Sequence, residues 1–249
     1  MIKRVFKLFQ IARKLSTSGA IDTINQVYQI PVSINLFFSL ISIGSKNTHL
    51  QNNNPGQNLC EALQGMGTTF IKLGQFLATR PDIIGEEMAK DLERLQDKVP
   101  AFELYEAKKV IKKEIGEKQY QNILEIGEPI AAASIAQVHF AKIKNENQEK
   151  EVAIKILRPD IEQLFNEELD ALMLFAYIVE NTISKAKRLK LVEVVYLLRE
   201  ITNIEMDLRF EAAAANELYE NTKLDKGFNV PKIYWNYTTK KILTLDKVN

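Results

Sequence analysis

Alternating apolar and polar residues predict a β-strand at the centre of the chain. In the run Val-Ala-Ile-Lys-Ile-Leu, residues 152–157, every second residue is β-branched and apolar, which is the period of a strand with one buried face. Lys155 falls on the opposite face, beside the small Ala153. Upstream, residues 129–140 read Pro-Ile-Ala-Ala-Ala-Ser-Ile-Ala-Gln-Val-His-Phe and predict two further short strands joined by a loop of small residues. The pattern therefore predicts a sheet whose polar face presents Lys155.

Helical spacing dominates the rest of the chain. Apolar residues recur every three or four positions in the segments 59–77, 101–115, 161–185 and 191–219, which is typical of helices with one buried face. We expect the last of these segments to be one long helix. Near the end of the chain, residues 230–237 and 242–245 are expected to form a hairpin, which closes a five-stranded antiparallel sheet. The predicted fold class is α+β.

The first 14 residues predict a basic amphipathic helix. Ile2, Val5, Phe6, Phe9 and Ala12 have helical spacing, and lysines and arginines surround them. Such a helix lies on an anionic membrane surface or packs on its own domain with its charges in water, and the sequence leaves both open. It lacks the small-residue cleavage pattern of a signal peptide. The apolar run 31–44 contains serines and an asparagine and falls short of the roughly 18 to 20 apolar residues that span a bilayer, so we expect no transmembrane segment in this sequence.

Composition narrows the classes of function. The fractions of hydrophobic residues, 46%, and charged residues, 26%, are ordinary for a globular protein. A net charge of +1, without clusters of basic and aromatic residues, gives no reason to expect nucleic-acid binding. The single Cys60 excludes an internal disulfide, and two histidines without a cysteine cluster give no zinc spacing. A reducing compartment fits this composition.

The central stretch resembles a known family. In protein kinases the third strand carries Val-Ala-x-Lys, whose lysine reaches the nucleotide phosphates, and a preceding glycine-rich loop covers them with backbone N–H groups. Here the loop is rich in alanine. The phrase Ser-Ile-Ala-Gln-Val-His, residues 134–139, and the run Val-Ala-Ile-Lys-Ile-Leu-Arg-Pro-Asp, residues 152–160, are similar to the UbiB/ADCK family of atypical kinases. This resemblance implies a kinase-like N-lobe that binds ATP or ADP.

The resemblance assigns the candidate nucleotide-binding residues. They are Lys155 and the loop with its flanks, namely Ile130, Ala131, Ala132, Ala133, Ser134, Ile135, Ala136, Gln137 and Val138. Glycine lets a backbone adopt φ > 0 and approach phosphate closely. The three consecutive alanines restrict both the backbone dihedral angles and the distance of approach to phosphate. We therefore expect an altered nucleotide pose. His139 lies within a predicted strand, where a packed histidine is the ordinary interpretation.

A second motif, Lys-x-Gly-Gln, lies in the helical region. Lys72 and Gln75 are three residues apart and share a helix face. Gly74 costs about 1 kcal/mol relative to alanine inside a helix, which indicates that another group approaches closely there. From the residues alone, Lys72 is a solvated charge. The resemblance implies instead that this motif belongs to a helical extension that lies across the nucleotide cleft.

Three acidic residues, Glu205, Asp207 and Glu211, lie in the predicted C-helix. On one continuous helix, Asp207 and Glu211 share a face, and Glu205 points about 200° away from Asp207. A C-helix glutamate pairs with the third-strand lysine in kinases, and Glu211 is our choice for that role. Glu205-x-Asp207 matches the third motif of the family, and Lys72 is the expected partner of Glu205. The alternative, three solvated acids, stays open.

The resemblance also implies parts that this sequence does not contain. No His-x-Asp catalytic loop is present, and no Asp-x-Gly metal loop follows a large-lobe hairpin. We therefore assign no catalytic residue and no metal ligand, and expect Mg²⁺ only with a C-lobe, which is absent. The predicted domains are 1–58, leading helices and linker; 59–126, the helical Lys-x-Gly-Gln extension; and 127–249, the N-lobe with a helical insertion.

Two functions of different classes remain open. In the first, the chain is the front part of a UbiB-type kinase or ATPase that supports ubiquinone biosynthesis, as the resemblance implies. Its partners would be a C-lobe chain or other ubiquinone-biosynthesis proteins, in the bacterial cytoplasm or peripherally on the cytoplasmic face of the inner membrane. In the second, it is a non-catalytic remnant or a membrane-associated interaction module. The motifs persist in both, so they do not separate the two.

Overall fold

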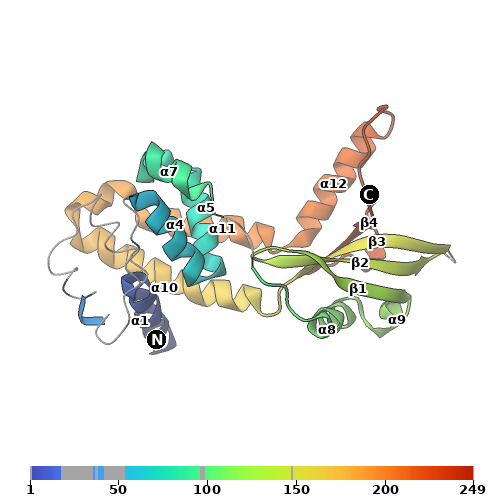
Figure 1. The fold of residues 1–249 in the computed structure, drawn as a ribbon, viewed down its shortest axis with the longest axis horizontal. Helices are drawn as coiled ribbons and strands as arrows, with labels where there is room; N and C mark the ends of the chain where they lie inside the picture. The colour runs from blue at the N-terminus through green and yellow to red at the C-terminus, as the bar shows by residue number, and fades with distance from the viewer. Residues whose placement is uncertain are drawn as a thin grey trace. The chain divides into compact units, whose positions relative to one another are not determined.

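The computed structural model describes residues 2–17, 36, 39–41, 54–95, 99–146 and 148–248. Most of the apolar run 31–44 and the greater part of the predicted linker therefore lie outside the described residues. The described chain is α+β (Figure 1). Its contacts group into unit 1, Met1–Asp97 with Gln163–Arg199, and unit 2, Lys98–Glu162 with Glu200–Asn249. The domain boundaries predicted from the sequence stay a prediction.

Unit 1 is helical. It contains α1 (Ile2–Thr17), α4 (Pro55–Met66), α5 (Thr68–Ala78), α6 (Pro81–Ile84) and α7 (Glu86–Leu92), with most of α10 (Ile161–Thr182), the short 3₁₀ helix η1 (Ser184–Leu189) and the first part of α11 (Leu191–Glu205). Leu63, Phe70 and Leu92 are buried. Gly67, with φ of 106°, separates α4 from α5, since glycine adopts this conformation without strain. The apolar period from residue 59 to 77 thus forms two helices.

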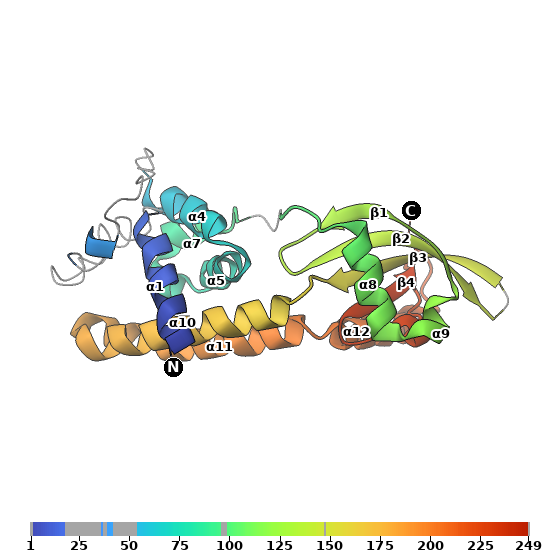
Figure 2. The ribbon, with the colours of Figure 1, turned by 90° about the horizontal axis from the view of Figure 1, so that it is seen from below.

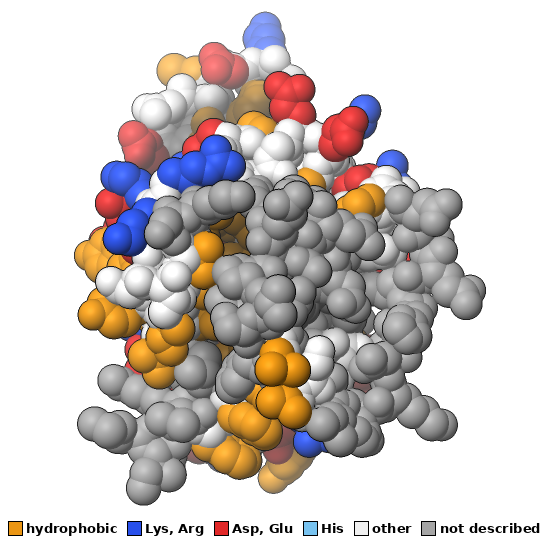
Figure 3. All heavy atoms as spheres, turned by 90° about the vertical axis from the view of Figure 1, so that its left-hand side faces the viewer, with side chains coloured by type: hydrophobic (Ala, Val, Ile, Leu, Met, Phe, Trp, Pro, Cys, Tyr) orange, Lys and Arg blue, Asp and Glu red, His pale blue; other side chains and the backbone are white. Residues whose placement is uncertain are grey.

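Helix α1 packs on unit 1 through one face and leaves another open. Ile11, Ala12 and Leu15 are buried, and the Nζ atom of Lys14 donates to the carbonyl oxygen of Met66 at 3.1 Å. Phe6 is 62% exposed. Figure 3 shows further apolar side chains at the surface of this unit. In the described part of the chain, no helix has the length and apolar character needed to cross a membrane.

Unit 2 is built around an antiparallel sheet of four described strands in the order β1-β2-β3-β4. The strands are β1 (Ile123–Ala132), β2 (Ala136–Asn145), β3 (Gln148–Leu157) and β4 (Ile242–Asp246), and the helices are α8 (Leu104–Ile115), α9 (Glu117–Tyr120), α12 (Leu208–Thr222) and the 3₁₀ helix η2 (Trp235–Tyr237). Helices α8 and α12 lie on opposite faces of the sheet (Figures 1 and 2). Ile111 of α8 packs with Val152, Ile154 and Ile156, which confirms the predicted alternation along β3.

The predicted fifth strand is wrong. Residues 230–237 form only an isolated bridge, between Ile233 and Leu245, and then the turn of η2. The chain leaves the ladder because Tyr237 turns into the core: its side chain is 2% exposed, and its hydroxyl donates to the carbonyl oxygen of Lys144 at 2.9 Å. Pro231 also lacks the N–H that a ladder requires. The sheet of the described residues therefore has four strands.

The predicted long helix from 191 to 219 is also wrong, because it is broken between α11 and α12. Asp207 has extended φ and ψ and is the N-cap of α12; its side chain accepts a hydrogen bond from the N–H of Arg209 at 3.1 Å. The N–H of Leu208 donates to the carbonyl oxygen of Lys240 at 2.9 Å. Aspartate favours such caps because its carboxylate binds the free N–H groups of the first turn. The periodicity of apolar residues continues across the break and hides it.

Candidate nucleotide-binding site

The structure brings Lys155 of β3 and Glu211 of α12 together. The Nζ atom of Lys155 lies 2.9 Å from Oε1 and 2.7 Å from Oε2 of Glu211. The two side chains are 29% and 49% exposed, so the ion pair is held in place and still open to a ligand. In register, Lys155 lies opposite Val138 on β2 and Leu243 on β4. A cationic group is thus positioned on the face of the sheet that α12 covers.

The alanine-rich loop is shorter than its sequence indicates. Ala131 and Ala132 still belong to β1 and pair with Val138 and Gln137 of β2, which leaves three residues, 133–135, between the strands. None of them is among the described non-glycine residues with positive φ. The N–H of Ala133 donates to the carbonyl oxygen of Ala136 at 2.8 Å. At least one of the loop's N–H groups is therefore used within the loop and does not point at a phosphate.

Only part of the predicted loop segment is open to solvent. Ile130 is 51% exposed, Ala131 is exposed, and Val138 is half-buried. Directly opposed residues of neighbouring strands share a face, so Ala131, Val138 and Lys155 lie on the same side of the sheet. The remaining loop residues are half-buried or buried: Ala132 and Ala133 are intermediate, and Ser134, Ile135, Ala136 and Gln137 are buried.

The side chain of Gln137 faces the interior. It is 1% exposed, and its amide binds the N–H and C=O of Phe102 and the ring of His139. The sequence contained a signal for this position: Gln137, His139, Ala141 and Ile143 alternate along β2, and all four are buried. The apolar end of that series marks the core face of the sheet. The resemblance to the kinase family assigns Gln137 to the nucleotide loop, whereas strand alternation along β2 assigns it to the core face, where the structure places it.

Gly74 and Gln75 of the Lys-x-Gly-Gln motif make contacts within unit 1. A Cβ atom at Gly74 would overlap with the side chain of Leu95 and would lie 2.8 Å from Cδ1 of Leu63. The Nε2 atom of Gln75 donates to the carbonyl oxygen of Leu95 at 3.5 Å. The close approach predicted at Gly74 is therefore made by two leucines of the helical unit. Lys72, on the same helix, is half-buried.

The Glu-x-Asp motif spans the break between two helices. Glu205 is the last residue of α11, and Asp207 is the N-cap of α12. The guanidinium of Arg209 donates to both carboxylate oxygens of Asp207, at 2.9 and 2.6 Å, and this bonding lowers the pKa of Asp207. The 200° angle expected for one continuous helix does not apply here. Lys72 lies in unit 1 and Glu205 in unit 2, so their pairing stays a prediction.

Comparison with known proteins identifies the family. The model of the ABC1 atypical kinase-like domain matches residues 94–249, which include the alanine-rich loop, Lys155 and Glu211. The chain belongs to the ABC1 family of atypical kinases. This is the family, also called UbiB/ADCK, whose motifs the sequence carries.

Curated members of the ABC1 family match most of this chain. A probable protein kinase UbiB from Marinobacter nauticus is 34% identical over 250 residues, which is 99% of this chain and 44% of the relative. Proteins of the same name from Pseudomonas paraeruginosa and Azotobacter vinelandii are 38% and 37% identical over 78% and 75% of this chain. The chain spans less than half the length of these relatives: 44%, 36% and 34%.

The residues that this ABC1 chain offers fit a nucleotide phosphate better than a metal ion. Lys155 supplies a partly exposed ammonium, and Glu211 holds it without burying it. Across the described residues, no group of three or more His, Cys, Asp and Glu side chains comes together as a metal site. Lys155 and Glu211 are therefore the residues that would hold a nucleotide phosphate.

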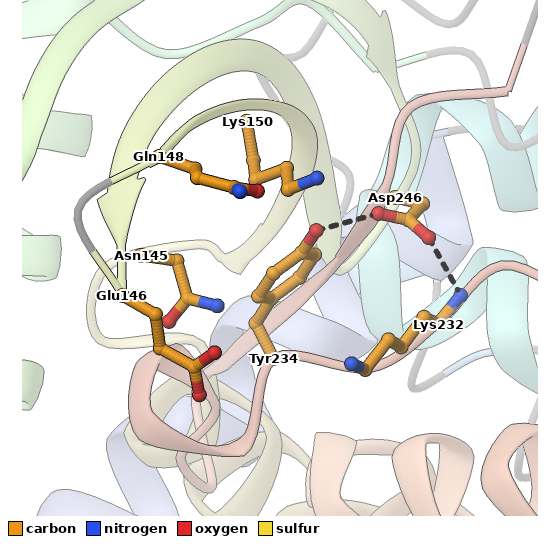
Figure 4. A pocket seen from close by; sticks show the side chains of 7 residues that line it. All are labelled: Asn145, Glu146, Gln148, Lys150, Lys232, Tyr234 and Asp246. Atoms are coloured by element: carbon orange, nitrogen blue, oxygen red, sulfur yellow. Dashed lines mark hydrogen bonds between the residues drawn. The ribbon is translucent and has the colours of Figure 1, made fainter.

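A polar pocket of about 340 Å³ lies elsewhere in unit 2 of this ABC1 chain (Figure 4). The hydroxyl of Tyr234 donates to Oδ1 of Asp246 at 2.7 Å, and burial raises the pKa of Tyr234. Lys150 and Lys155 are five residues apart on β3, about 16 Å at the usual strand rise, and on opposite faces. This pocket is therefore separate from the candidate nucleotide site. Its lining residues are Asn145, Glu146, Gln148, Lys150, Lys232, Tyr234 and Asp246.

Proposed function

We propose that this chain is the N-terminal part of a UbiB-type atypical kinase or ATPase that supports ubiquinone biosynthesis, and that it binds ATP or ADP. The ion pair between Lys155 and Glu211 is the observation that carries the proposal. Since the chain spans less than half of its curated relatives, the catalytic aspartate and the Mg²⁺ ligands would come from a C-lobe. That lobe would be a further part of the protein or a partner chain.

The proposed role of Lys155 is to bind the nucleotide phosphates. An ammonium is a compact charge that attracts phosphate oxygens. Glu211 would hold the lysine in the position seen in the structure, so that less conformational entropy is lost when the nucleotide binds. The exposed Ala131 and the half-buried Val138, on the same face, would contact the rest of the nucleotide. This arrangement favours binding, and it does not by itself supply the proton transfer that a kinase needs.

Nucleotide binding by the wild-type chain and two variants tests the proposal. With a fluorescent ATP analogue, Lys155→Ala should weaken binding by about tenfold or more, since a charged hydrogen bond to phosphate is lost, and Glu211→Gln should weaken it less. Lys142→Ala is the control, because Lys142 lies on the neighbouring strand β2 and its Nζ atom forms an exposed ion pair with Glu125 at 3.3 Å. Equal affinities of the wild type and Lys155→Ala for the ATP analogue would contradict the proposal.

An alternative is a non-catalytic module that contacts a membrane surface. Phe6 and Phe9 of α1 are 62% and 46% exposed on a helix whose sequence is basic, and such helices bind anionic bilayers through apolar side chains. This location would be the cytoplasmic face of a bacterial inner membrane. The joint variant Phe6→Ser and Phe9→Ser should reduce sedimentation with vesicles that contain anionic lipid. Sedimentation unchanged from the wild type would argue against this surface.

A further inference from the structure

A cluster of buried hydrogen bonds joins β2 to the segment that precedes α8. Oε1 of Gln137 accepts from the N–H of Phe102 at 2.8 Å, and Nε2 of Gln137 donates to the carbonyl oxygen of Phe102 at 3.1 Å. Nε2 of Gln137 also lies 2.8 Å from Nε2 of His139, and Nδ1 of His139 lies 2.8 Å from the carbonyl oxygen of Gly127. Gln137 and His139 are 1% and 0% exposed. One glutamine thus satisfies both backbone groups of a residue 35 positions away.

The partners assign the orientation of every group in this cluster. A carbonyl oxygen only accepts, so Nδ1 of His139 donates to Gly127 and, in the neutral ring, Nε2 accepts. The Gln137 amide must then direct one N–H at His139 and the other at Phe102, and its oxygen at the N–H of Phe102. A flipped amide would place donor against donor at Phe102. The cluster therefore holds Phe102 in one position.

Arg158 joins the same segment to the alanine-rich loop. Its guanidinium donates to the carbonyl oxygen of Ala133 from Nε at 3.1 Å and from Nη2 at 2.9 Å, and Nη2 also lies 3.2 and 2.8 Å from the carbonyl oxygens of Val99 and Pro100. The guanidinium carbon lies 5.8 Å from the centre of the Phe102 ring, a cation–π distance. Because the guanidinium is planar and rigid, it sets the spacing between these carbonyl groups.

Few other hydrogen bonds hold the loop among the residues that the structure describes. The hydroxyl of Ser134 is buried and forms no hydrogen bond with any residue that the structure describes. Besides the bond within the loop from Ala133 to Ala136, the backbone N–H of Arg158 donates to the carbonyl oxygen of Ile135 at 2.9 Å. Arg158 thus binds the loop through both its backbone and its side chain. Buried polar groups that are fully bonded make a segment rigid.

We propose that Gln137 and Arg158 are positioning residues that clasp the segment 99–102 to the alanine-rich loop, so that the position of this segment sets the conformation of the proposed nucleotide site. The inference deepens the proposed function by adding a means of regulation. The segment 99–102 lies at the start of unit 2, just after the boundary at which the first stretch of unit 1 ends in the sequence. A displacement of the segment would pull on the Ala133 carbonyl through Arg158, and on β2 through Gln137.

Backbone amide exchange of the full chain without nucleotide tests the clasp independently of the proposed function. Arg158→Met removes every hydrogen bond of the guanidinium. It leaves the hydrogen bond from the N–H of Phe102 to Gln137 in place. We expect exchange at residues 99–102 and 133–135 to rise by about tenfold, the effect of losing one or two net hydrogen bonds, while exchange in the β3–β4 ladder stays unchanged. Lys142→Met is the matched surface control. Unchanged exchange at Phe102 would overturn the coupling.

A double-mutant cycle gives the second readout. If both residues act through one segment, Gln137→Met and Arg158→Met should each weaken binding of the fluorescent ATP analogue by about tenfold, and the double variant should be little weaker than either single one. If the fold-losses of affinity of the two single variants multiply in the double variant, the two residues have independent structural roles, and this result would overturn the clasp. Arg158→Lys and Gln137→Asn serve if the methionine variants do not fold, since an ammonium lacks the rigid planar fork of the guanidinium and the asparagine side chain is one methylene shorter than that of glutamine. If even the wild type binds no nucleotide, the proposed function fails, and the amide exchange still decides the clasp.

Discussion

The alanine-rich loop and strand β3 carry the two halves of one kinase-like motif, yet the structure uses them differently. On β3, Lys155 is partly exposed and is held by Glu211 of a distant helix. In and beside the loop, Ser134, Ile135, Ala136 and Gln137 are buried, and the chain's own groups bind the backbone. One motif can therefore contain both residues that face a ligand and residues that form the surface on which the ligand would lie.

The same division runs through the other two motifs. In Lys-x-Gly-Gln, Gly74 and Gln75 pack against Leu95, whereas Lys72 is half-buried. In Glu-x-Asp, Asp207 caps α12, and Glu205 is the half-buried last residue of α11. Each motif thus contains at least one residue whose contacts are structural. Substitutions at neighbouring positions should therefore separate loss of stability from loss of binding.

The largest difference should come from adjacent residues on β3. Ile154 is 1% exposed in the core against α8, so Ile154→Ala should lower the free energy of unfolding by about 2 to 5 kcal/mol. Lys155→Ala removes a partly exposed ion pair and should change it by about 1 kcal/mol or less. Urea titration measures the free energy of unfolding of both variants. Similar losses at the two positions would show that the polar face of β3 is also structural.

A glycine pair tests the helical unit. Gly74→Ala introduces a Cβ atom that overlaps with Leu95 and should destabilise unit 1 by about 1 to 3 kcal/mol. Gly65→Ala is the matched control in α4, because a Cβ atom there has no neighbour within 4 Å among the described residues. It should leave stability unchanged or raise it by up to about 1 kcal/mol. The comparison fails if both variants have the same thermal midpoint.

The buried side of the loop should also give a pH dependence. Burial lowers the pKa of His139 below 6.5, against the smaller opposing effects of its bond to Gly127 and the charge of Glu128. The unfolded chain then binds more protons than the folded chain. The free energy of unfolding therefore has its full value above about pH 6.5. It falls by up to about 1.4 kcal/mol per pH unit as the pH decreases toward the pKa of the folded state.

His139→Gln removes the titrating ring and keeps one donor and one acceptor. Between pH 7.5 and pH 5.5, its unfolding free energy should therefore vary less than that of the wild type, as measured by urea titration at each pH. An equally steep pH dependence in the variant would assign the effect to other groups.

The smallest effect is expected from a charge exchange between two motifs. If Lys72 pairs with Glu205, then Lys72→Glu and Glu205→Lys should each reduce nucleotide affinity or stability, and the double variant should recover about 0.5 kcal/mol or more of the loss. Thermal melts with and without ATP measure both quantities. Purely additive losses would count against the pair.

The sequence by itself determined which face of β3 is apolar and which presents Lys155, because strand alternation is a local property of the backbone. The motifs also identified the family and the α+β class. They predicted Glu211 as the residue beside Lys155, and the structure places its carboxylate 2.7 Å from the lysine. The apolar pattern required only residue type and spacing, whereas the family and the choice of Glu211 came from the resemblance of the motifs to known kinases.

The tertiary structure alone decided which motif residues are structural. The burial of Gln137 depends on Phe102, 35 residues away, and the break before α12 depends on a bond from Leu208 to Lys240. The fifth strand is replaced because Tyr237 packs in the core and binds the Lys144 carbonyl. Each of these outcomes depends on a partner remote in sequence, and no local pattern records where that partner lies, because packing and buried hydrogen bonds are satisfied only after the chain has folded.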